Sequence, residues 1–102
     1  MSTVMTEQPQ YQEWQQVMDL ITRAVQDGQH EMLLTMLMTA DEREALIARV
    51  NIFGELMKGD LSQRQISQML GVGIATITRG SNELKSRTDA EKQELSNLIL
   101  KS

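Results

Sequence analysis

Apolar residues recur along the first third of the chain at the three- and four-residue spacing of one helical face, and no stretch alternates with the two-residue period of a strand. The spacing predicts an amphipathic helix from Tyr11 to Gly28. Segment 32–38 is apolar on nearly every side, which predicts a short helix enclosed by other helices or by a second subunit. Residues 1–10 are polar and contain Pro9, so a flexible N-terminal arm is expected there.

Start signals for three further helices follow from the capping-box spacing, in which a Ser or Thr precedes a Glu or Gln by three positions. The pairs are Thr39 with Glu42, Ser62 with Gln65, and Thr88 with Glu91. In the helix after Ser62, the residues Ile66, Met69 and Leu70 are predicted to face the same way. A separate helix is predicted from Ile74, Ile77 and Leu84, so the fold class is all-α with six helices per subunit.

Residues 62–79 contain the parts of a helix-turn-helix unit, which needs a short first helix, a tight turn and a second helix whose N-terminal end can enter a DNA major groove. Gly71 allows the positive φ of such a turn. The seam between the two helices is predicted to consist of Ile66, Leu70, Ile74 and Ile77. Arg79 points away from this seam. The alternative is a plain αα-hairpin packed into a helical bundle.

Composition excludes several function classes. With 102 residues the chain is one domain at most, and its three aromatic residues give it a small apolar core, which a dimer with a shared core would enlarge. There is no Cys, and His30 is the single His, so no catalytic constellation or metal-ligand set is expected and the chain is predicted not to be an enzyme. No apolar run of about 20 residues or signal peptide is found, which predicts a cytoplasmic protein without membrane partners.

Charge is unevenly distributed along the chain. Residues 1–57 have a net charge of −6, residues 58–88 of +3 and residues 89–102 of −1. Because exposed charges are screened beyond about 8–10 Å at physiological salt, a basic segment of an acidic protein can still bind a polyanion. Segment 58–88 is therefore the candidate surface for nucleic acid, although an ordinary solvated face would have a similar excess.

Taken together, several motifs resemble the Trp repressor family, the tryptophan-responsive transcriptional repressors of bacteria. The resemblance rests on Gln12-Glu13-Trp14, Leu37-Met38-Thr39, Asp41-Glu42-Arg43-Glu44-Ala45-Leu46, Arg49-Val50, Ser62-Gln63-Arg64, Gly73-Ile74-Ala75-Thr76-Ile77-Thr78-Arg79-Gly80-Ser81-Asn82 and Leu84-Lys85. It covers roughly residues 11–100.

The resemblance implies an intertwined homodimer that binds L-tryptophan as a corepressor, uses no prosthetic group, and docks on palindromic operators of tryptophan biosynthesis or transport genes. Residues 11–102 would form a single helical domain. Within it, 11–58 and 88–100 would form the dimer core, and 62–86 the helix-turn-helix reading head. A ligand-independent helix-turn-helix regulator and an oligomerisation module without a nucleic-acid role remain alternatives.

The resemblance also assigns a ligand site. Arg79 would pair with the carboxylate of tryptophan, Arg49 would stack on the indole, and Gly80 would leave room for the ring. The ammonium would be received by the carbonyls of Met36 and Met38 and by Thr39 of the other subunit. Glu83 stands where the family usually has Ser, and we expect it to lie near the ammonium.

For DNA, the resemblance implies one set of residues that hold phosphates and another that reads the groove. The first set is Gln63, Ser81, Asn82 and Lys85, and the second is Arg64, Gly73, Ile74, Ala75, Thr76 and Thr78, with Arg79 also on this surface. Three further positions depart from the family pattern: Ser67 replaces a Lys that contacts DNA, Ala40 replaces a helix-starting Pro, and Phe53 is larger than the usual β-branched residue.

Overall fold

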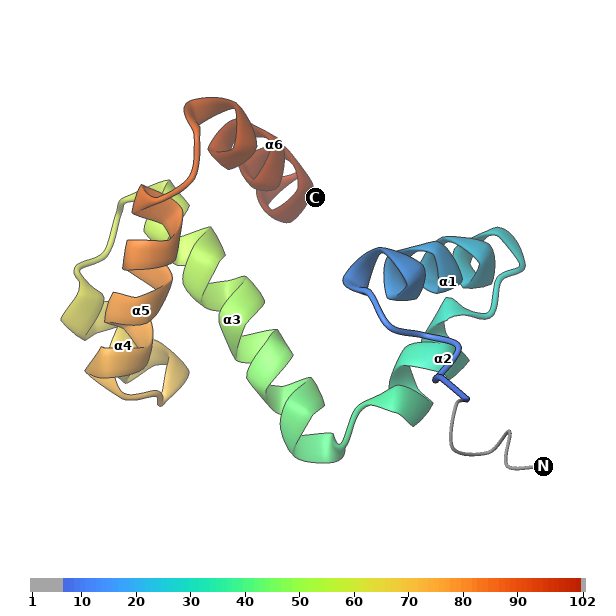
Figure 1. Cartoon of the computed structure of the whole chain (residues 1–102). Helices are drawn as coiled ribbons and strands as arrows, with labels where there is room; N and C mark the ends of the chain where they lie inside the picture. Colours follow the sequence, from blue (N-terminus) through green and yellow to red (C-terminus); the bar gives the residue numbers. More distant parts are fainter. Residues whose placement is uncertain (1–6, 102) are drawn as a thin grey trace. The chain divides into compact units, whose positions relative to one another are not determined.

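A computed structural model describes residues 7–101, and this part of the chain folds into six α-helices without a strand (Figure 1). The helices are α1 (Trp14–Gln26), α2 (His30–Leu37), α3 (Ala40–Lys58), α4 (Gln63–Leu70), α5 (Ile74–Lys85) and α6 (Asp89–Leu100). The predicted all-α class and helix number are confirmed for these residues. Most of the expected N-terminal arm, residues 1–6, lies outside the described residues.

Capping boxes start α4 and α6 as predicted. The Ser62 hydroxyl accepts a hydrogen bond from the backbone N–H of Gln65 (3.1 Å), and the Gln65 side-chain oxygen accepts one from the backbone N–H of Ser62 (2.8 Å). Thr88 and Glu91 make the same reciprocal pair, at 3.1 and 3.0 Å. These bonds satisfy N–H groups that the first turn of a helix leaves unpaired.

The first helix begins at Trp14, later than the predicted Tyr11. The side-chain oxygen of Gln16 accepts hydrogen bonds from the backbone N–H groups of Gln12 (2.6 Å) and Glu13 (2.8 Å). Because this oxygen takes the role of a helical carbonyl, the residues before Trp14 are held outside the helix. The apolar spacing alone did not reveal this glutamine cap.

The described residues form two compact units, which are divided between Thr39 and Ala40. In the first unit α1 packs on α2, and Ala24 is the one described residue there that is buried. The apolar segment predicted to be enclosed is largely open within a single chain, since Met36 is 78% and Leu37 57% exposed. Enclosure of α2 by a second subunit therefore stays a prediction.

In the second unit α3 packs against α4, α5 and α6, and α4 packs against α5 (Figure 1). One isoleucine from each of α3, α4 and α5 forms the core: Ile52, Ile66 and Ile77, each at most 2% exposed. The predicted seam was right for Ile66, Ile77 and the partly buried Leu70. The core position of Ile52 was not predicted from the sequence.

The prediction that Ile74 belongs to the seam was wrong, because Ile74 is 48% exposed. It is the first residue of α5, and helical side chains lean toward the N-terminus, so its side chain extends past the helix end toward solvent. Met69 was also wrongly assigned to the inner face of α4 and is 53% exposed. The inner face of the helix pair is narrower than the apolar pattern predicted.

Close approach of α5 to α3 occurs at Gly80, which is buried. A Cβ atom at this position would lie 3.0 Å from Cγ2 of Ile52 and 3.5 Å from Cε1 of Phe53. The buried Gly54 of α3 has a similar relation to α6, with a Cβ position 3.2 Å from Cγ2 of Ile99. Small residues at these two points set how closely the second unit packs.

Candidate functional site

The turn between α4 and α5 is organised by Gly71 and Ser67. Gly71 has φ of 67°, in the left-handed region that favours glycine. The backbone N–H groups of Gly71 (2.9 Å) and Val72 (3.2 Å) both donate to the carbonyl of Ser67. The Ser67 hydroxyl in turn donates to the carbonyl of Val72. The predicted helix-turn-helix is therefore present, and Ser67 fastens its turn, a role that sequence reasoning did not assign.

The residues predicted to contact DNA fall mainly on the outer side of this pair of helices. Those that are exposed are Arg64, Gly73, Ile74, Ala75, Thr78, Arg79, Asn82 and Lys85. Gln63 and Thr76 are partly buried, whereas Ser81 is buried and stands apart from the exposed set. The N-terminal half of α5, which must enter a groove in a helix-turn-helix protein, is thus accessible.

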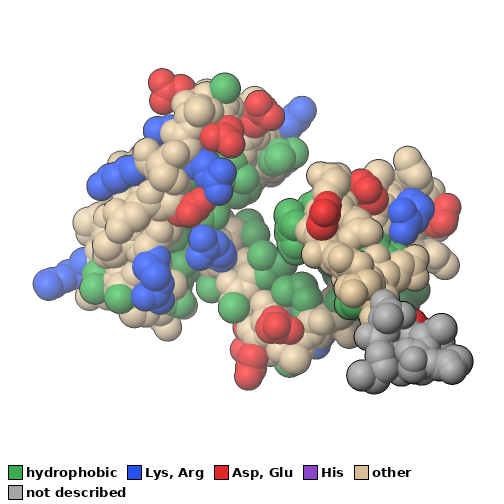
Figure 2. All heavy atoms as spheres, viewed as in Figure 1, with side chains coloured by type: hydrophobic (Ala, Val, Ile, Leu, Met, Phe, Trp, Pro, Cys, Tyr) green, Lys and Arg blue, Asp and Glu red, His purple; other side chains and the backbone are tan. Residues whose placement is uncertain are grey.

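One side-chain hydrogen bond joins the two helices on this outer side. The Thr78 hydroxyl donates to the side-chain oxygen of Gln63 at 3.1 Å. The bond fixes a residue of α4 and a residue of α5 in one arrangement. Lys and Arg side chains gather over the part of the molecule that holds these helices, on the face drawn in Figure 2.

A cavity of about 280 Å³ lies between α3 and α5, behind the exposed side of α5. It is lined by Ala45, Ala48, Arg49, Ile52, Val72, Thr76 and Gly80. Its size is near the lower end of the ~300–1,000 Å³ of small-molecule sites, and its lining is mostly apolar with few polar groups, as such sites require. Two predicted ligand residues, Arg49 and Gly80, therefore meet in one pocket.

Arg79 approaches the same pocket through Thr76. Its Nη2 donates a hydrogen bond to the Thr76 hydroxyl at 3.2 Å, and Thr76 lines the cavity. Arg79 itself is exposed and does not line it. A guanidinium at this place can form a charge-assisted pair with the carboxylate of a ligand that enters the pocket.

Arg49 stacks on Phe53, four residues later on α3. The Cζ atom of Arg49 lies 5.0 Å from the centroid of the Phe53 ring, within the ~6 Å range of cation–π attraction. Phe53 is larger than the residue usual in the family, and its contact with Arg49 was not predicted from the sequence. Helical spacing of four residues was the available signal.

Glu83 is engaged with a neighbour at the end of α5. Its Oε2 accepts a hydrogen bond from Nε of Arg87 at 2.8 Å, and Arg87 also lies 3.6 Å from the carboxylate of Glu91. The Glu83 hydrogen bond and charge raise the pKa of Arg87 further above its ordinary value. The backbone N–H of Thr88 lowers the pKa of Glu91. Glu83 is thus part of the α5–α6 junction.

The three remaining predicted ligand residues belong to the first unit. Met36 and Thr39 are exposed and Met38 is partly buried. The carbonyls of Met36 and Met38 lie at the C-terminal end of α2, of which Met38 is the C-cap residue.

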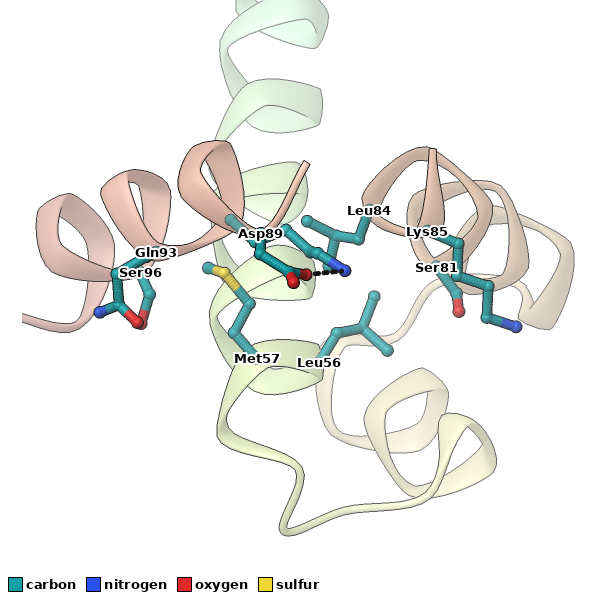
Figure 3. Close-up of a pocket in the computed structure, with 9 residues that line it drawn as sticks. Leu56, Met57, Ser81, Leu84, Lys85, Asp89, Gln93 and Ser96 are labelled. Atoms are coloured by element: carbon teal, nitrogen blue, oxygen red, sulfur yellow. Dashed lines mark ion pairs between the residues drawn. The ribbon is translucent and has the colours of Figure 1, made fainter. Parts of the chain in front are cut away.

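A larger cavity, of about 540 Å³, lies between α3, α5 and α6 (Figure 3). The buried Ser81 lines it together with Lys85. On α6 the pair Lys92 and Asp89, 3.6 Å apart, also lines it. Sequence reasoning did not anticipate this cavity. Both polar and apolar side chains line the cavity, and none of the residues predicted to bind tryptophan is among them.

Fold and site define the class of a helix-turn-helix regulator with a small pocket behind its exposed helix. A model of the family described as "Trp repressor protein" matches residues 12–99. The chain belongs to the Trp repressor family. Members of this family are transcriptional regulators, and the chain is accordingly a tryptophan-related transcriptional repressor and not an enzyme.

Curated relatives cover nearly the whole chain. A Trp operon repressor homolog of Vibrio cholerae is 72% identical over 96 residues, which are 94% of this chain and 93% of the relative. Homologs of the same description are 65% identical in Vibrio atlanticus (95% of this chain, 99% of the relative) and 70% identical in Aliivibrio fischeri (90% and 85%). None of the helices in residues 7–101 is long and apolar enough to cross a membrane.

Proposed function

We propose that this protein is an L-tryptophan-activated repressor that docks as a homodimer on palindromic operators of tryptophan biosynthesis or transport genes, in the bacterial cytoplasm. The observation that carries the proposal is the pocket of about 280 Å³ behind α5. Thr76 lines this pocket from a helix whose other side is exposed. A ligand in the pocket therefore lies directly against the helix that would read DNA.

In the proposed complex the indole enters between α3 and α5, with Arg49 against its face and Gly80 at its edge. The carboxylate pairs with Arg79, which is already held at the pocket's margin by its bond to Thr76. Arginine suits both tasks, because its fork matches a carboxylate and its flat face stacks on a ring. The ammonium is received by the Met36 and Met38 carbonyls and Thr39 of the partner subunit.

Large exposed apolar side chains support the homodimer. Trp14 is 72%, Ile47 63% and Leu98 78% exposed in the single chain. Large apolar side chains that are this exposed on α1, α3 and α6 favour a partner that covers them. A second copy of this chain is the partner that the family implies, and a ligand site completed by that copy makes dimerisation a condition for tryptophan binding.

On DNA, the proposed roles divide between positioning and reading. Gln63, Asn82 and Lys85 would hold phosphates, with Ser81 assigned to the same group. Arg64, Gly73, Ile74, Ala75, Thr76 and Thr78 would line the major groove, with Arg79 beside them. Threonine and isoleucine methyl groups suit contact with thymine methyls, and the hydroxyls can bond base edges directly or through water.

Activation would occur by a population shift. Free reading heads sample several positions, and tryptophan, wedged between α3 and α5, favours the position that matches successive major grooves. A ligand that does not distinguish these positions fills the pocket without repression. Glu83 supports the alternative of a ligand-independent regulator, since its carboxylate is paired with Arg87 instead of standing free for an ammonium.

A thermal melt followed by far-UV circular dichroism tests the proposal without knowledge of the operator. A ligand that binds only the native dimer adds about 2.7 kcal/mol at a hundredfold excess over its Kd, which raises Tm by several degrees. We expect millimolar L-tryptophan to produce this rise and L-phenylalanine, the control, to produce little. An equal Tm with and without L-tryptophan contradicts ligand activation and favours the ligand-independent alternative.

A further inference from the structure

We propose that Phe53 is a positioning residue of the ligand pocket: its ring holds the Arg49 guanidinium against the cavity, so that a bound aromatic ring becomes the third layer of a stack. The inference rests on the proposed function and deepens it, because it assigns preference for an aromatic ligand to a residue outside the pocket lining.

The Phe53 ring is the contact that places the charged group of Arg49. Arg49 is exposed, and its guanidinium makes no hydrogen bond or ion pair with residues 7–101. Its Cζ atom lies 5.0 Å from the Phe53 ring centroid. An exposed arginine without such a contact populates many rotamers, and ordering it on binding costs affinity.

Phe53 lies close to α5 at Gly80. It is partly buried, and its Cε1 lies 3.5 Å from the position of a Cβ at Gly80, an ordinary van der Waals distance. The absence of a side chain at Gly80 leaves space for this ring edge. The Phe53 ring thus lies beside α5 on one side and within cation–π distance of Arg49.

Arg49 lines the cavity of about 280 Å³, whereas Phe53 does not. Arg49 therefore borders both the Phe53 ring and the cavity. A guanidinium is planar and delocalised, so one face can rest on Phe53 while the other accepts a ligand ring. An aliphatic ligand gains less from the same surface, because cation–π attraction needs the quadrupole of an aromatic ring.

The test is isothermal titration of the full chain with L-tryptophan. Phe53→Leu keeps an apolar side chain but removes the stacking face, and we expect Kd to rise roughly three- to tenfold. Phe53→Tyr keeps the face, so Kd stays within about twofold. In an Arg49→Met background, Phe53→Leu changes Kd by less than about twofold, because the residue through which it acts is gone.

A matched control comes from Leu56, which also packs at Gly80, with Cδ1 3.7 Å from the Cβ position. Leu56→Met alters the same helix contact without touching Arg49, and we expect wild-type affinity. Unliganded Tm values check folding, and Phe53→Met replaces Phe53→Leu if the latter does not fold.

The outcomes separate the two proposals. If the wild type binds L-tryptophan but Phe53→Leu binds equally well, or loses as much affinity in the Arg49→Met background, the positioning role is wrong and the proposed function stands. Loss of affinity in Leu56→Met equal to that in Phe53→Leu also overturns the positioning role. If the wild type itself binds no L-tryptophan at millimolar concentration, both proposals fail.

Discussion

The guanidinium of Arg79 donates a hydrogen bond to the hydroxyl of Thr76, one turn earlier on α5, at 3.2 Å. Thr76 lines the pocket between α3 and α5, whereas Arg79 is on the exposed side. The pair therefore connects the inside of the pocket to the surface assigned to DNA. If a ligand carboxylate pairs with Arg79, the interactions of this side chain on the DNA-reading helix change.

Arg79→Leu is expected to abolish most binding of L-tryptophan. Loss of a hydrogen bond to a charged group costs about 1.5–3 kcal/mol, which corresponds to roughly a 10- to 150-fold rise in Kd. Isothermal titration measures it. Thr78→Val, on the same helix but outside the pocket lining, is the matched control and retains ligand affinity. Equal loss in both variants would show that the effect comes from α5 as a whole.

Gly80→Ala is expected to destabilise the fold by about 1–3 kcal/mol, because its Cβ would lie 3.0 Å from Cγ2 of the core residue Ile52. Gly73→Ala has no heavy atom within 4 Å of the new Cβ, and only its helix-cap position matters, so we expect a loss below about 1 kcal/mol. Urea unfolding gives both values. Similar losses for the two variants would mean that α5 can move away from α3 at little cost.

Glu91 makes part of the stability depend on pH. Its pKa is lowered first by the backbone N–H of Thr88, so its stabilising effect is present above the ordinary pKa of 4.5 and is lost as pH falls through the lower value of the folded state. Glu91→Gln keeps a capping oxygen but does not titrate. Its Tm should fall less than that of the wild type between neutral and acidic pH.

Since the main cause is a hydrogen bond, the difference between wild type and Glu91→Gln should persist at high salt, where interactions between exposed charges are screened. Thermal melts over a pH series at low and high salt provide the comparison. Parallel Tm curves for the two proteins would show that Glu91 does not contribute to the acid sensitivity.

Local signals in the sequence predicted the helix starts and the turn, since Ser62 with Gln65 and Gly71 act through neighbours close in the chain. The burial of single residues was harder to predict from the sequence. Ile74 has the spacing of a core residue but lies at a helix end, where it is 48% exposed. Burial there depends on where α4 ends in space, which no local pattern encodes.

For the candidate site, too, the sequence predicted some features and left others open. The resemblance identified Arg49, Arg79 and Gly80, and the structure brings Arg49 and Gly80 together in one pocket. The stack of Arg49 on Phe53 and the pairing of Glu83 with Arg87 depend on side-chain rotamers selected by neighbouring helices and charges. A pattern of residue types leaves such choices open.

Leu98 offers a test of the homodimer. It is 78% exposed in the single chain, although the last turns of α6 contain the partly buried Ile99 and Leu100. If a second copy covers it, Leu98→Glu places an unpaired charge in an apolar interface, which costs several kcal/mol and favours dissociation. Sedimentation equilibrium should give twice the chain mass for the wild type and a lower average mass for the variant.

Asn97→Glu adds the same charge at the neighbouring exposed position and should remain dimeric. A wild type that sediments as a monomer at all concentrations would contradict the homodimer. If Leu98→Glu is fully dimeric, Leu98 does not lie in the dimer interface.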